Sequence, residues 1–189
     1  MSQAFPASSL RNATLLYGAM TLLAALLTVP MHAGLAILAV PNSPLAWLAG
    51  LAAGVLLLAA TWLTERLWPR FQALGNKMAQ LLGPVSRQQA WWLAVLSGIG
   101  EESLFRGPLQ VALGPVPATL LFAAAHGLGN RRLWPWPLFA LVAGGVFAWL
   151  AWHFHSPWPS AVAHIVVNAV NLRRLGQRYG RLDPPGTHV

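Results

Sequence analysis

Long apolar runs alternate with short polar or proline-containing stretches along the 189-residue chain. A helix needs about 20 mostly apolar residues to cross the hydrocarbon core of a membrane, with a range of about 17–25. The pattern predicts an all-α fold, a polytopic membrane helix bundle of about six transmembrane helices. The expected spans cover residues 10–29, 44–65, 88–106, 118–128, 135–154 and 157–172.

The connections between these runs carry most of the polar residues. Residues 66–87 mix charged side chains with Gly, Pro and Leu, which predicts a cytoplasmic loop with an interfacial amphipathic helix at about 70–82. Gly and Pro residues within 107–117 predict a short turn after the third run. No repeat or second unit is visible, so we expect a single transmembrane domain over residues 1–189.

The first apolar run has a cleaved signal peptide as its alternative interpretation. The run is longer than the apolar region of about 7–15 residues that signal peptides carry. Residues 30–33, which follow it, lack the small-residue pattern of a cleavage site. We therefore expect this run to be retained as the first span.

Composition supports the membrane assignment. Only 8% of the residues are charged, against about 25% in soluble domains. The net charge of +8 could indicate nucleic-acid binding, but the basic residues lie between apolar runs and form no basic helix or stacking platform. We therefore expect the lipid bilayer, and no nucleic acid, as a partner. The absence of Cys excludes disulfides and thiolate metal ligands.

Basic residues also predict the orientation in the membrane. Placing the N-terminus in the cytoplasm puts all Lys and Arg residues inside except Arg106, as the positive-inside rule requires. We expect an integral protein of the bacterial inner membrane with both termini cytoplasmic. Tryptophans near the expected span ends form aromatic belts: Trp47, Trp62, Trp68, Trp91, Trp92, Trp134, Trp136, Trp149, Trp152 and Trp158.

The chain has four acidic residues, and two of them lie inside an apolar run. Glu65 is at a span end beside Arg66 and Asp183 is in the tail, so both are expected to be solvated. Glu101 and Glu102 lie within the third run. A charge at the centre of a membrane helix costs about 2.5–3.5 kcal/mol on insertion scales and indicates function by default.

Helix geometry separates these two carboxylates. Glu102 and Arg106 are four residues apart, so they share a face and can form an ion pair. Glu101 is turned by about 100° from Glu102, which leaves it free for chemistry. Small residues on the preceding turns allow a neighbouring helix to approach closely: Ser97, Gly98 and Gly100.

Three more polar residues interrupt apolar runs. His126 ends the fourth run, while His164 and Asn168 are four apart on the sixth and share a face. A single membrane histidine is often a structural hydrogen-bonding group. Two histidines, an asparagine and a free Glu101 in so apolar a chain indicate a common polar site.

These residues fall into three motifs that resemble a known family. Residues 101–106 (EESLFR), 122–126 (FAAAH) and 164–168 (HIVVN) match EExxxR, FxxxH and HxxxN. This set, in this order, is similar to that of the CAAX-processing and bacteriocin-processing (CPBP, or Abi) intramembrane proteases. The resemblance covers a family-like catalytic core of about residues 88–172.

The resemblance implies hydrolysis of a peptide bond within the membrane. The substrate would be a membrane-associated or C-terminally anchored protein or peptide, and the chain would be an intramembrane endopeptidase. The motifs then name the catalytic residues and a supporting ion pair: Glu101, His126, His164 and Asn168, with Glu102 and Arg106.

Two mechanisms are compatible with this set. In the favoured one, which needs no cofactor, Glu101 is the general base that activates water and His126 orients the water and carries the proton. His164 and Asn168 would donate to the oxyanion. In the other, Glu101, His126 and His164 would bind a catalytic zinc ion, because one carboxylate and two histidines are a common zinc set.

Other functions use similar residues. The bundle could be a catalytically inactive membrane scaffold, or a small proton-coupled transporter whose polar residues line a pathway. Candidate substrates of a protease are prenylated C-termini, bacteriocin leaders and C-terminal membrane anchors of exported proteins. The expected topology opens the site nearer the outer face, which disfavours a cytosolic prenylated substrate.

Overall fold

The computed structural model describes residues 6–28, 40–127 and 133–182. All regular secondary structure in these ranges is helical, which confirms the all-α prediction. The elements are α1 (Ala7–Thr28), α2 (Pro44–Leu67), α3 (Pro69–Leu82), α4 (Arg87–Leu104), the π-helical turn η2 (Phe105–Leu109), α5 (Gln110–Leu113), α6 (Pro115–Gly127), α7 (Pro135–Phe154) and α8 (Trp158–Leu182). Residues 30–33, Arg131, Arg132 and Asp183, used in the predictions above, lie outside the described residues.

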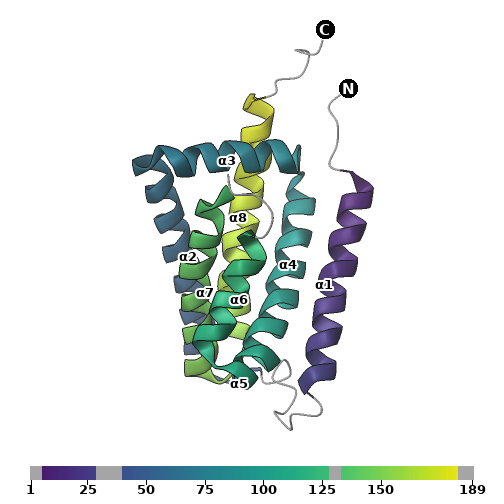
Figure 1. Cartoon of the computed structure of the whole chain (residues 1–189), viewed down its shortest axis with the longest axis vertical. Helices are drawn as coiled ribbons and strands as arrows, with labels where there is room; N and C mark the ends of the chain where they lie inside the picture. Colours follow the sequence, from purple (N-terminus) through teal and green to yellow (C-terminus); the bar gives the residue numbers. More distant parts are fainter. Residues whose placement is uncertain (1–5, 29–39, 128–132, 183–189) are drawn as a thin grey trace.

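The long helices run side by side, and α3 lies across one end of the bundle (Figure 1). The first turn of α1 and the last turn of α8 are at this same end (Figure 1). Six spans would place the start of the first helix and the end of the last on the same side of the membrane, and this arrangement agrees with that. Which face of the membrane this end occupies stays a prediction.

The six expected spans coincide with α1, α2, α4, α6, α7 and α8. Among the described helices, α1, α2 and α7 are long and apolar enough to cross a membrane by length and composition. α4 contains the two buried glutamates, α8 ends in a basic segment, and α6 has only 13 residues. The fold is that of a helical membrane bundle, and for α4, α6 and α8 the crossing stays a prediction.

Two segments differ from the sequence-based expectation. The turn expected directly after the third span is instead helical through η2 and α5, and the chain turns at Gly114, whose φ of 86° favours glycine. Within η2, Gly107 leaves helical geometry next to Pro108, which has no N–H to donate. The second difference is α8, which continues past residue 172 to Leu182. The amphipathic helix expected at 70–82 is present as α3.

Small residues bring two helices close to opposite sides of α4. A methyl group on Gly98 would lie 2.5 Å from the Ile165 side chain of α8. A methyl group on Gly100 would lie 2.8 Å from the Tyr17 carbonyl oxygen of α1. Neither approach is possible with a larger residue, so the expected role of these glycines is confirmed.

Candidate active site

The two glutamates lie in the last turn of α4, at the end of the helix remote from α3 (Figure 1). α4 begins at a capping box in which Ser86 Oγ accepts from the Gln89 N–H and Gln89 Oε1 accepts from the Ser86 N–H. Both glutamates are buried, Glu101 with 8% and Glu102 with 0% of its surface exposed. Their partners are different.

Glu102 binds two basic side chains. Its Oε2 accepts from Arg106 Nε at 3.0 Å, which confirms the ion pair expected from their spacing. Its Oε1 accepts from His164 Nδ1 at 2.9 Å, a contact between α4 and α8 that the sequence did not predict. Arg106 also reaches Thr119 Oγ1 at 3.4 Å and lies 5.0 Å from the centre of the Phe122 ring. Glu102 is therefore held on both oxygens inside the bundle.

Glu101 faces His126, with 3.7 Å between Glu101 Oε2 and His126 Nε2. This separation is too long for a direct hydrogen bond. His126 Nδ1 lies 2.8 Å from the Phe122 carbonyl oxygen, which can only accept, so this contact assigns the ring proton to Nδ1. Among the described residues, no group hydrogen bonds to the buried Oε2 of Glu101. In the neutral form of the His126 ring, the unprotonated Nε2 therefore faces the unshared oxygen of Glu101.

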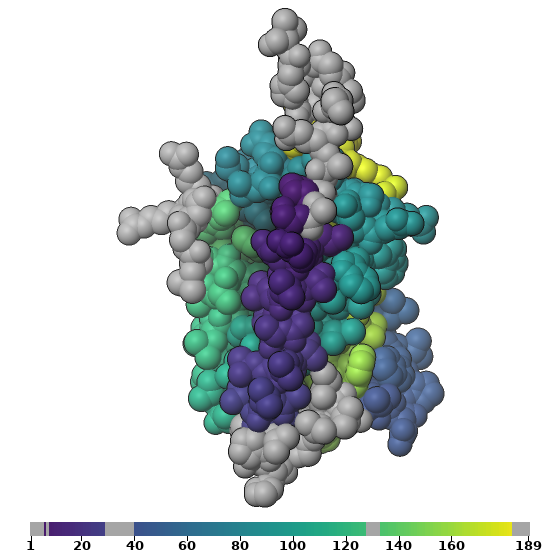
Figure 2. All heavy atoms as spheres, turned by 90° about the vertical axis from the view of Figure 1, so that its right-hand side faces the viewer, coloured from purple at the N-terminus to yellow at the C-terminus, as the bar shows by residue number. Residues whose placement is uncertain are grey.

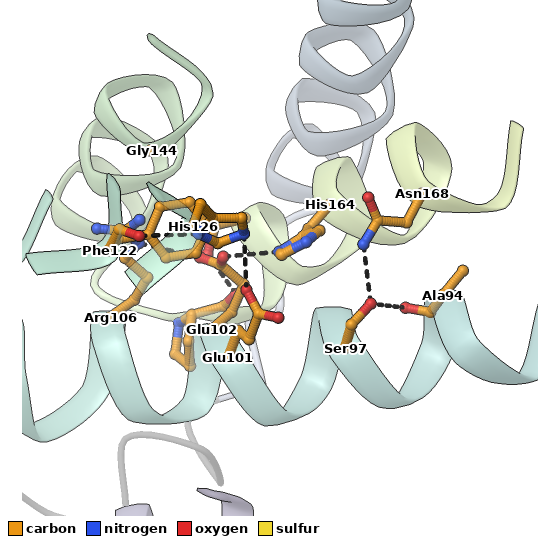
Figure 3. Close-up of polar contacts among 12 residues, drawn as sticks. Ala94, Ser97, Glu101, Glu102, Arg106, Phe122, His126, Gly144, His164 and Asn168 are labelled. Carbon is orange, nitrogen blue, oxygen red and sulfur yellow. Dashed lines mark hydrogen bonds and ion pairs between the residues drawn. The ribbon is translucent and has the colours of Figure 1, made fainter. Parts of the chain in front are cut away.

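Asn168 lies one helical turn beyond His164 on α8. Its Nδ2 donates to Ser97 Oγ at 2.8 Å, and Ser97 in turn donates to the Ala94 carbonyl oxygen at 3.2 Å. Figure 3 shows Asn168 and Ser97 beside the group in which Glu101, Glu102, His126 and His164 converge. The four predicted catalytic residues are thus neighbours, but Asn168 and His164 each bind α4 through a residue other than Glu101.

Aromatic rings hold both histidines. The Phe122 ring centre lies 4.5 Å from that of His126, and Phe147 stacks on His164 at 5.1 Å with an angle of 17° between the rings. Phe122 and Phe147 are each 2% exposed and belong to the main hydrophobic core. Rigid apolar neighbours limit the orientations that the two imidazoles can adopt.

Sequence reasoning missed several contributors to this site. Tyr17 of α1 lies against α4 at Gly100, beside Glu101, and the Glu101 carboxylate acts electrostatically on its hydroxyl. Phe147 stacks on His164, and Ser97, which was expected only to allow close helix packing, accepts a hydrogen bond from Asn168. Tyr17 had one sequence signal, a phenol within an apolar run, but nothing within the run shows which helix it meets.

The three side chains of the zinc alternative are directed to different partners. Among the described residues, no three His, Asp or Glu side chains are grouped as metal ligands. His164 directs Nδ1 to Glu102, whereas Glu101 and His126 face each other. As they lie, Glu101, His126 and His164 do not form a three-ligand site.

Comparison with known proteins agrees with the resemblance over the part of the chain that holds this site. Residues 85–170 match the family model "Type II CAAX prenyl endopeptidase Rce1-like". This segment is therefore similar to the CPBP proteases over a little less than half of the chain. It contains all three motifs and nearly coincides with the core expected at 88–172. The N-terminal part, with α1 and α2, lies outside the match.

The chain is also similar to the uncharacterized protein YpbD of Bacillus subtilis (strain 168). The two are 32% identical over 104 residues, which is 52% of this chain and 51% of YpbD. The chain therefore spans about half the length of the curated relative that it matches. No solved structure gives a significant match. The activity of the matched segment, residues 85–170, is therefore proposed below.

Proposed function

We propose that the chain is an intramembrane endopeptidase that hydrolyses a peptide bond in a membrane-associated or C-terminally anchored protein. The observation that carries the proposal is the contrast within the glutamate pair. Glu102 has both oxygens bound by basic groups, whereas Glu101 leaves Oε2 without a hydrogen-bond partner among the described residues, 3.7 Å from His126 Nε2. A buried acceptor of this kind suits a general base.

The geometry at Glu101 supports activation of water. Glu101 Oε2 and His126 Nε2 are both acceptors, and a water molecule has two hydrogens to donate. Such a water would keep an oxygen lone pair for attack on the scissile carbonyl carbon while Glu101 takes its proton. His126 would then help to carry that proton to the leaving amine, which breaks the C–N bond and releases a carboxylic acid and an amine.

His164 and Asn168 are proposed to stabilise the oxyanion. Asn168 has two N–H bonds on Nδ2 and gives one to Ser97, so one remains for the substrate. His164 already uses Nδ1 toward Glu102, so its Nε2 can donate only when the ring carries both protons. The Glu102 carboxylate would stabilise that positive charge, which gives Glu102 and Arg106 a supporting role. One oxyanion donor typically contributes about 10²–10³ in rate.

We propose the metal-free glutamic mechanism rather than the zinc mechanism. The arrangement of Glu101 opposite His126, with His164 directed to Glu102, supports it. Activity that survives exhaustive treatment with a strong zinc chelator would agree with this choice. Loss of activity on chelation, restored by added zinc, would overturn it.

The proposed location is the bacterial inner membrane with both termini cytoplasmic. In this orientation the α3 end of the bundle is cytoplasmic, and Glu101, in the last turn of α4, lies in the outer half of that helix. This depth favours the C-terminal membrane anchor of an exported protein over a cytosolic prenylated chain. Reporter fusions at Lys77 and at the C-terminus should both give cytoplasmic signals; periplasmic signals from both would reverse the side on which the site opens.

The proposed function is tested by comparing membrane-protein termini in cells that express the wild type or Glu101→Ala. New C- or N-termini near membrane anchors should appear with the wild type and disappear with the variant. Equal amounts of the two proteins, measured in the membrane fraction, are the control. Identical sets of termini in both cells would contradict the protease and favour the scaffold or the transporter.

A further inference from the structure

We infer that Tyr17 of α1 is a positioning residue for Glu101, which makes α1 part of the catalytic unit although it lies outside the segment that matches the family. The inference rests on the proposed function, because it assigns Tyr17 a role through the proposed base. Three features of the α1–α4 contact support it.

The first feature is where α1 packs. α1 runs along the outer face of the bundle (Figure 2), and its Leu15, Leu16, Leu22, Leu23 and Leu26 side chains are exposed. At Tyr17, by contrast, α1 comes so close to α4 that an ideal Cβ on Gly100 would lie 2.8 Å from the Tyr17 carbonyl oxygen and 3.0 Å from its Cβ. Tyr17 is therefore placed against α4 at the residue directly before Glu101.

The second feature is the polar contact itself. The half-buried Tyr17 side chain lies close enough to Glu101 for the carboxylate to act electrostatically on its hydroxyl. A phenol O–H donates and an ionised carboxylate only accepts. In the proposed arrangement the Tyr17 hydroxyl donates to the other oxygen of Glu101, because Oε2 faces His126 and has no hydrogen-bond partner in the described part of the chain.

The third feature is a second hydrogen bond between the same two helices. Trp92 Nε1 donates to Thr14 Oγ1 at 3.1 Å, about one turn before Tyr17 on α1. Thr14 therefore helps to attach α1 to α4 without touching Glu101. This pair provides a matched control, because Thr14→Val removes an α1–α4 hydrogen bond of similar kind and keeps the size of the side chain.

The consequence for Glu101 follows from these contacts. A carboxylate that is held at only one point can rotate, and general-base catalysis requires a defined geometry. The Tyr17 hydroxyl restrains the carboxylate so that Oε2 stays directed toward His126. Tyr17 does not meet the substrate in this role; it acts through Glu101.

The first experiment needs no substrate. The chain has two tyrosines, Tyr17 and Tyr179, so protein labelled with ¹³C at tyrosine Cζ gives two NMR signals in detergent, and Tyr17→Phe identifies the first. Glu101→Ala should move the Tyr17 signal, because the hydroxyl loses its acceptor, while Thr14→Val should leave it close to its wild-type position. An unchanged Tyr17 signal in Glu101→Ala would overturn the inference whether or not the chain is a protease.

The second experiment measures cleavage of a reporter substrate by Tyr17→Phe, which removes only the hydroxyl. We expect kcat to fall by about 10- to 100-fold, the range of a hydrogen bond to a charged group, with KM nearly unchanged.

Thr14→Val separates this role from a purely structural one. It should keep the kcat and the KM of the wild type. Equal losses of kcat in Thr14→Val and Tyr17→Phe would show that Tyr17 only attaches α1 to the bundle and would overturn the inference.

Discussion

Two carboxylates in this chain each bind two basic side chains and each join α8 to another helix. Glu65, at the end of α2, contacts Arg174 at 3.3 Å and Arg178 at 3.0 Å. Glu102, at the end of α4, contacts Arg106 at 3.0 Å and His164 at 2.9 Å. The clusters use the same chemistry at similar distances, but they differ in burial.

Burial determines what each cluster can do. The Glu65 side chain is 18% exposed and that of Arg174 is 34%, whereas the side chains of Glu102 and Arg106 are completely buried. Charges near water interact weakly because the solvent screens them. Charges inside the bundle depend on their partners, because the loss of one partner leaves an uncompensated buried charge. Loss of a charge should therefore have a small effect on stability in the Glu65 cluster and a large effect in the buried Glu102 cluster.

Glu101 differs from both, because it is buried without a basic partner at hydrogen-bond distance among the described residues. A base must be able to accept a proton during the reaction, and a carboxylate with both oxygens bound by cations is poorly suited to that. The comparison thus distinguishes Glu101, the proposed base, from Glu102, which is paired in the interior, and from Glu65, which is paired at the end of the bundle.

The largest expected effect is on activity in Glu101→Gln. The variant keeps the shape of the side chain and removes the base, so cleavage should fall by about 10²–10⁴-fold, the usual contribution of general-base catalysis. Rates are measured on a reporter substrate in detergent or liposomes, with thermal unfolding as the control for folding. A well-folded Glu101→Gln with wild-type rates would leave the proposed mechanism without its base.

The next effect is on stability in Glu102→Gln. Arg106 and His164 lose their carboxylate inside the bundle, and breaking a buried ion pair by removing one member costs about 3–5 kcal/mol. We expect a clear decrease in thermal stability as well as in activity. If Glu102→Gln proved stable and inactive while Glu101→Gln unfolded readily, the roles of the two glutamates, base and buried ion-pair partner, would be reversed.

A double variant sharpens this result. Glu102→Gln combined with Arg106→Gln removes both charges of the pair, so no unpaired guanidinium remains. Part of the stability lost in Glu102→Gln should return, although His164 still lacks its partner. Unfolding of the single and double variants under one set of detergent conditions measures the coupling. A double variant less stable than Glu102→Gln would argue against a buried unpaired charge as the cause.

The smallest effect is expected for Glu65→Gln. This change removes the carboxylate of the partly exposed cluster, where ion pairs typically contribute about 0–1 kcal/mol. Its unfolding temperature should stay close to that of the wild type, and its activity should not change. High salt should reduce the difference further, because screening already weakens the pairs with Arg174 and Arg178. A loss as large as that of Glu102→Gln would show that burial is not what separates the two clusters.

The sequence alone determined the relations that lie within one helix. Hydropathy located the helices, because a membrane span requires a continuous apolar run. The spacing of Glu102 and Arg106 predicted their ion pair, because four residues bring two side chains to the same face of a helix. The same rule placed His164 and Asn168 together on α8, and the three motifs indicated the family. These inferences use only local geometry, which a single segment carries.

Only the tertiary structure decided which face of each helix meets which neighbour. It directed His164 to Glu102 and Asn168 to Ser97, and it placed Tyr17 against Gly100, beside Glu101. It also paired Glu65, expected to be solvated beside Arg66, with the basic end of α8. The rotation of a helix about its axis depends on packing against all its neighbours, such as the close contacts at Gly98 and Gly100. No single run of sequence contains that information, because the packing surfaces come from segments far apart in the chain.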